Sequence, residues 1–168
     1  MSLTELAKAE LDIHITKKGP ELVEPWMSAP FSLSPAEVVE AIAKFKELAV
    51  RYINAGMPLG LAVKSADCAA LAIATHSKKV IQAMEATGQT GFSPDSSTTI
   101  ARIGRITKYV TCSMIMYSVA EQMNLSRRPS LDDLEAAFAG GEPNYEETPI
   151  KAFQFFLAGH DQKNTLLS

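Results

Sequence analysis

The stretch 34-SPAEVVEAIAKFKELAVRYINAG-56 decides the fold class of this 168-residue chain, because it carries a full set of helix signals. Ser34 can accept hydrogen bonds from the free N–H groups of a first helical turn, and Pro35 suits the first helical position. Glu37, three residues after the serine, completes a capping box. The segment 54–56 ends in a glycine and is followed two residues later by Pro58, which predicts the end of the helix. An apolar face recurs at spacings of three and four, through Val38, Ile42, Phe45, Leu48, Ala49, Tyr52 and Ile53. The stretch therefore predicts an amphipathic helix.

Helix signals recur along the rest of the chain, and strand signals do not. Ser130 with Asp133 repeats the capping-box spacing ahead of a shorter apolar pattern. The loop GQTGFSPDSS is rich in Gly, Pro, Asp and Ser, and it separates two long helical patterns. Further helices are expected over about 59–87, 97–124, 131–138 and 148–159. The sequence predicts an all-α fold.

The first 33 residues read as a helical extension of the domain that covers 34–168, and the two parts form one structural unit. Ser2 with Glu5 predicts a helix start, and Gly19-Pro20 predicts its end. A short isolated helix is marginal in water, so this one needs a surface to dock on. The apolar residues available for docking are Leu3, Leu6, Leu11, Leu22, Val23 and Trp26. We therefore expect a homo- or hetero-oligomer that forms through the N-terminal helices.

The composition is that of a globular protein, with 46% hydrophobic and 21% charged residues. A net charge of −3 argues against a nucleic-acid partner, whose binding surface is usually basic. No apolar run is long enough for an integral membrane segment, and the N-terminus lacks a signal core, which predicts a cytoplasmic location. Cys68 and Cys112 lie in apolar helical patterns, so two buried free thiols are favoured over a disulfide.

The chain lacks the patterns of catalytic chemistry, and no enzyme is expected. No metal site is predicted, because His14, His76 and His160 have no partner at metal-ligand spacing. A satisfied or surface histidine is favoured for His76, and a haem ligand is the alternative. The carboxylate pairs 132–133 and 146–147 lie near expected helix starts, where capping and the helix dipole explain them. The sequence contains neither a phosphate-binding loop after a strand nor a nucleophile elbow.

The stretch IGRITKYVTCSMI (103–115) carries the candidate ligand site. Arg102, Arg105 and Lys108 step by three, which indicates either a solvated face or a cationic edge for carboxylates. The expected apolar row of this helix consists of Ile100, Ile103, Ile106 or Thr107, Val110, Met114 and Tyr117. We expect a cleft with both arginines at its mouth, closed by the 59–87 helix and the following loop. In this cleft Ile103, Ile106 and Val110 contact a flat ligand; the alternative is a plain core wall.

The order and spacing of these helices resemble the phycobiliproteins, the globin-like antenna subunits of phycobilisomes, over roughly 34–159. SPAEVVEAIAKFK is similar to the family's helix opening Leu-Ser-x-x-Glu. ARIGRITKYVTCSMI is similar to the family's tract ending in Arg-(Tyr or Met)-Val-Thr-Tyr, with 108–111 as the matching residues. The resemblance implies a globin-like fold, pairing through N-terminal helices, phycobilisome subunits as partners, and a role in cyanobacterial photosynthesis.

Departures from the family pattern argue against a covalent chromophore. The family attaches its bilin to a cysteine about one turn before the arginine, where this chain has Thr98, Thr99 and Ile100. The family's neighbouring aspartate is also missing, since Ile103 follows Arg102. Only Arg102 remains to pair with a propionate, so the resemblance implies at most a non-covalent linear tetrapyrrole.

Two functions follow as expectations. The first is a non-enzymatic, phycobiliprotein-like component of the phycobilisome, structural or assembly-related, located in the cytoplasm and peripheral to the thylakoid. The alternative is a globin-like sensory or regulatory domain whose pocket is empty or holds lipid or haem, with His76 as the haem ligand.

Overall fold

The computed structural model describes residues 33–88, 97–125 and 128–160, and these residues form helices joined by turns and loops. The elements are α2 (Pro35–Asn54), α3 (Leu59–Gly88), α4 (Ser97–Gln122), α5 (Leu131–Ala137), α6 (Thr148–Phe155) and the short π-helix η1 (Phe156–His160). No strand occurs in these ranges, so the all-α prediction is confirmed. The predicted extension 1–33 lies outside the described residues except for Leu33, and so does most of the 88–97 loop.

Helix α2 begins as its sequence predicts. The Ser34 hydroxyl accepts a hydrogen bond from the Glu37 N–H at 3.2 Å, and the Glu37 carboxylate accepts one from the Ser34 N–H at 3.0 Å. At the other end, Gly56 has a φ of 99°, the left-handed conformation that glycine adopts without strain. A capping box therefore begins α2, and a left-handed glycine follows its end.

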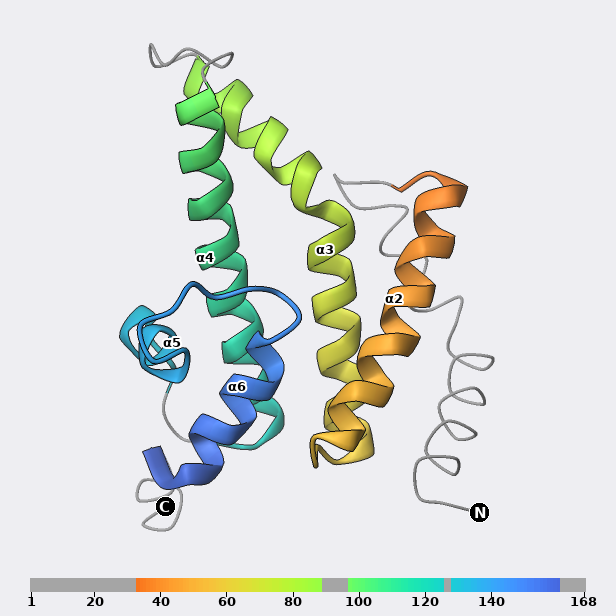
Figure 1. The fold of residues 1–168 in the computed structure, drawn as a ribbon, viewed down its shortest axis with the longest axis vertical. Helices are drawn as coiled ribbons and strands as arrows, with labels where there is room; N and C mark the ends of the chain where they lie inside the picture. Colours follow the sequence, from red (N-terminus) through yellow and green to blue (C-terminus); the bar gives the residue numbers. More distant parts are fainter. Residues whose placement is uncertain (1–32, 89–96, 126–127, 161–168) are drawn as a thin grey trace.

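Helices α2 and α3 form an antiparallel pair, and the C-terminal half of α3 leans toward the start of α4 (Figure 1). Small side chains on α3 let α2 approach closely, and Ala62, Ala66 and Ala69 are fully buried. The α2 side of this contact consists of Phe45, Leu48, Ala49 and Tyr52, each at most 1% exposed. Burial of Phe45 and Leu48 contributes about 1.5–3 kcal/mol each, so this pair anchors the core.

The core continues from α3 into α4, α6 and η1, and α5 covers the C-terminal half of α4 (Figure 1). Leu134 is the anchor of α5 and is fully buried. The Ser130–Asp133 capping box forms as predicted, and Gly140, with φ 83°, follows the helix end. The α4 and α6–η1 residues in the core are Cys112, Ile115, Met116, Val119, Ala120, Ile150, Ala152, Phe153, Phe155 and Phe156.

Both cysteines are free thiols, as predicted, although only Cys112 is fully buried and Cys68 is half-buried. Burial raises the pKa of both thiols. Neither thiol is therefore a thiolate at neutral pH. None of the helices in the described ranges combines the length and apolar character that a membrane span requires.

Candidate functional site

The predicted ligand site lies wholly on α4, and the structure divides its residues between two environments. Ile103 is buried, at 8% exposure. Ile106 and Val110 are 56% and 53% exposed, and Arg102 and Arg105 are exposed as well. Four of the five predicted residues therefore lie on an open helix surface, and the predicted cleft remains a prediction.

Helix α4 carries a row of exposed apolar side chains, which we call the outer row: Ile106, Val110, Met114 and Tyr117. Their spacing of four, four and three residues places them on one side of the helix. Their exposed fractions run from 41% for Tyr117 to 65% for Met114. Contiguous apolar surface of this kind marks interaction sites on proteins more often than isolated exposed residues do.

Charged residues stand at both ends of the outer row. Arg102 is exposed one turn before Ile106, and Glu121 is exposed one turn after Tyr117. The Arg128 guanidinium carbon lies 4.9 Å from the centroid of the Tyr117 ring, which is a cation–π contact. The outer row is thus an apolar strip with a positive charge one turn before its N-terminal end, and with a carboxylate one turn after its C-terminal end beside the Arg128 cation.

A histidine, His76 of α3, lies near Gly104 of α4, away from the outer row. The His76 Nδ1 lies 2.7 Å from the Tyr145 hydroxyl, and the two rings meet edge to face at 5.5 Å between centroids. Burial lowers the pKa of His76, and the nearby Lys108 and Lys79 lower it further. Burial also raises the pKa of Tyr145 to about 12, so the phenol stays protonated. His76 is therefore a hydrogen-bonded, neutral residue at neutral pH, which agrees with the satisfied-histidine interpretation.

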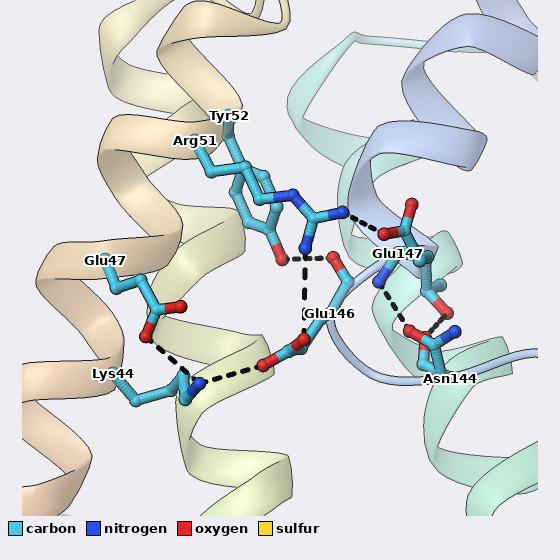
Figure 2. Close-up of polar contacts among 8 residues, drawn as sticks. Lys44, Glu47, Arg51, Tyr52, Asn144, Glu146 and Glu147 are labelled. Atoms are coloured by element: carbon cyan, nitrogen blue, oxygen red, sulfur yellow. Dashed lines mark hydrogen bonds and ion pairs between the residues drawn. The ribbon is translucent and has the colours of Figure 1, made fainter.

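A second polar cluster ties the segment before α6 to α2 (Figure 2). Lys44 contacts Glu146 and Glu47, each at 3.0 Å, and Arg51 pairs with Glu147. The buried Tyr52 hydroxyl donates a 2.6 Å hydrogen bond to the Glu146 carbonyl oxygen.

These contacts correct the prediction that the 146–147 carboxylates cap a helix. Glu147 is the residue before α6, but its side chain makes no cap hydrogen bond. The Asn144 side chain accepts a 2.8 Å hydrogen bond from the Glu147 N–H instead. The carboxylates turn toward two basic residues of α2 because ion pairing with Lys44 and Arg51 is available there. Sequence spacing gave no signal for this, since the partners are about a hundred residues apart.

One carboxylate in the interior has an incomplete set of partners. Asp67 Oδ1 is buried and has no hydrogen-bond partner among the described residues. Burial raises the pKa of Asp67 to about 6, although the positive charge of Lys64 opposes the shift. The neighbouring Cys68 Sγ lies 3.9 Å from the Ser118 Oγ of α4. Because its pKa is raised, Asp67 keeps its proton over part of the pH range in which a free aspartate is ionised.

A groove of about 240 Å³ lies between α2 and α3, away from the predicted ligand residues. Its floor is apolar, with Ile73 and alanines, and its rim carries Glu37, Glu40 and Lys44. Lys78 bridges the Glu37 carboxylate at 3.0 and 3.1 Å. No residue of α4 lines this groove.

No group of three or more metal-binding side chains occurs within 33–88, 97–125 and 128–160. Comparison of the chain with protein-family models, with curated proteins and with solved structures found no match.

Proposed function

We propose that this chain is a non-enzymatic, phycobiliprotein-like component of the light-harvesting system that acts by contacting other proteins. The single observation that carries the proposal is the outer row of α4. A convex helix side with four exposed apolar residues suits a helical partner, whereas small-molecule sites are concave. The motifs 34–46 and 101–115, which resemble the family, supply the link to the phycobilisome, a globin-like topology and a place at the thylakoid surface.

The partners in this proposal are phycobilisome subunits, and the test is direct binding. The purified chain is mixed with isolated phycobiliprotein subunits, and complexes are separated by gel filtration or sedimentation. Val110→Asp should abolish the complex because it places a charge in the middle of the outer row. Val39→Asp is the matched control, since Val39 is a 67% exposed valine on α2. Equal binding by both variants, or no complex with the wild-type chain, would contradict the proposal.

A non-covalent linear tetrapyrrole is the second part of the proposal. Arg102 supplies a guanidinium for a propionate, and the exposed Ile106 and Val110 supply apolar contact beside it. The affinity should be modest, because non-covalent contacts alone must offset the ordering of the ligand.

Absorption spectra of protein made with and without bilin synthesis test this second part. A red-region band that is lost on denaturation and weakened by Arg102→Ala supports it. A band that survives denaturation shows a covalent adduct and overturns it. A Soret band instead favours the haem-binding sensory domain, and the absence of any band leaves the protein-contact role alone.

A further inference from the structure

The residues of the outer row and the charges beyond its ends are arranged symmetrically about one point on α4. Ile106 and Tyr117 lie equally far from a midpoint between positions 111 and 112, and so do Arg102 and Glu121. Val110 and Met114 share this midpoint to within about half a residue. At about 1.5 Å of rise per residue, the two charged side chains each stand about 14 Å from the midpoint.

This arrangement is what an antiparallel contact between two identical helices needs. In a two-fold symmetric contact, the same patch faces itself, so each residue meets the partner of its mirror position. An axis through the midpoint brings Ile106 opposite the second copy's Tyr117, and Val110 opposite its Met114. All four side chains are exposed and available for such a contact.

The charges select the antiparallel direction. With the axis at the midpoint, Arg102 of each copy faces Glu121 of the other, which makes two opposite-charge pairs per dimer. A parallel pairing sets like charges against each other at both ends. Arg128 adds a positive charge over the Tyr117 ring, so the direction is set by Arg102 and Glu121, which stand equally far from the midpoint along the helix.

The available area indicates a contact of moderate strength. The four apolar side chains supply on the order of 400 Å² per copy, about half of the ~800 Å² that each partner buries in a standard interface. We therefore expect dissociation in the micromolar range.

We propose that this chain forms a two-fold symmetric homodimer in which the outer rows of two α4 helices pack antiparallel, with Arg102 against Glu121 across both ends. The inference rests on the proposed use of this face for protein contact, and it names a second copy of the chain as a partner. The dimer is a property of the purified full chain alone, without any phycobilisome subunit or tetrapyrrole.

The test is a dilution series of the full chain by analytical ultracentrifugation, with circular dichroism to check that each variant is folded. The wild-type chain and Val39→Asp should show the same monomer–dimer equilibrium, and Val110→Asp should be monomeric. Arg102→Glu and Glu121→Arg should each raise the dissociation constant about tenfold. The double variant should return it close to the wild-type value, because the pairs re-form with reversed sign.

Cross-linking with a short bismaleimide tests the direction of the helices. The double variant Ile106→Cys with Tyr117→Cys should cross-link between copies, because these positions face each other in the antiparallel contact. Each single variant should cross-link no more than the wild-type chain, which controls for Cys68 and Cys112. Efficient cross-linking of Ile106→Cys alone would indicate a parallel contact and overturn the proposal.

A wild-type chain that stays monomeric throughout the series also overturns the proposal, and so does a charge swap that fails to restore the dimer. These outcomes are distinct from failure of the proposed function. A monomer that binds phycobilisome subunits through Val110 overturns only the homodimer. A dimer that binds no subunit and no bilin overturns only the light-harvesting role.

Discussion

The two sides of α4 have similar chemistry and opposite environments. The inner side places Cys112, Met116 and Val119 in the core, each at most 1% exposed. The outer side exposes Val110 and Met114 by more than half of their surface. Both sides hold a valine and a methionine at helical spacing, so apolar periodicity by itself does not decide which side meets the core. The decision comes from α3, α5 and α6, which pack against α4 and leave the outer row uncovered.

The largest expected effect on stability comes from comparing two variants of α4, one with an aspartate on the inner side and one with an aspartate on the outer side. Val119→Asp buries a charge without a partner, and it should reduce the free energy of unfolding by about 3 kcal/mol or more. Val110→Asp should change the stability of the monomer by no more than about 0.5 kcal/mol. Urea denaturation below the dimer dissociation range measures both. Comparable losses for the two variants would show that the outer row is covered within the monomer.

Two methionines, Met116 on the inner side of α4 and Met114 on the outer side, allow the same comparison by removing side-chain volume instead of adding charge. Met116→Ala leaves a cavity in the core and should cost about 2–5 kcal/mol, because the neighbouring side chains relax only partly. Met114→Ala, at a position that is 65% exposed, should cost about 0.5 kcal/mol or less in the monomer. Thermal unfolding at matched concentrations gives the difference. Equal shifts in Tm would contradict the assignment of the two sides.

Local features of the fold could be predicted from the sequence, and long-range ones could not. The capping boxes at Ser34 and Ser130 depend on residues three positions apart, so their hydrogen bonds follow from spacing. The His76–Tyr145 and Arg51–Glu147 contacts join residues 69 and 96 positions apart, and nothing in the local pattern pairs them.

The candidate site shows the same limit. Spacing put six positions in one apolar row: Ile100, Ile103, Ile106 or Thr107, Val110, Met114 and Tyr117. The structure buries Ile103 and exposes the other apolar members, because exposure depends on neighbours placed by the whole fold. The spacing did contain one further signal, the mirror placement of Arg102 and Glu121 about the row.

The partly buried Asp67 of α3 predicts a pH effect of intermediate size. The pKa of Asp67 is raised from its ordinary value of 3.8 to about 6 in the folded chain, chiefly by burial. The unfolded chain therefore loses this proton first, and the contribution of Asp67 to stability falls as pH rises from about 4 to about 6. Asp67→Asn removes the titration, and it should stabilise the protein by about 1–2 kcal/mol at pH 7 and by little at pH 4.

The measurement is the urea midpoint of both proteins across this pH range. The difference between them isolates Asp67 from the other carboxylates and from His76, which titrate in both proteins. A difference that stays constant from pH 4 to pH 7 would show that the folded-state pKa of Asp67 is not raised.

The smallest expected effect is a gain in stability at Gly104, where α4 passes His76. A Cβ added at Gly104 would lie 4.0 Å from the His76 Nε2, which is ordinary van der Waals contact, so alanine fits without moving the ring. Glycine inside a helix costs about 0.5–1 kcal/mol relative to alanine, because the unfolded chain loses more conformational freedom on folding. Gly104→Ala should therefore raise the free energy of unfolding by about 0.5 kcal/mol while leaving the His76–Tyr145 hydrogen bond in place. Chemical denaturation gives the stability, and the His76 ring resonances in an NMR pH titration report on the hydrogen bond. If the variant is less stable, or if His76 titrates at a higher pH, then the α4 backbone at Gly104 lies too close to the His76 ring to accept a methyl group.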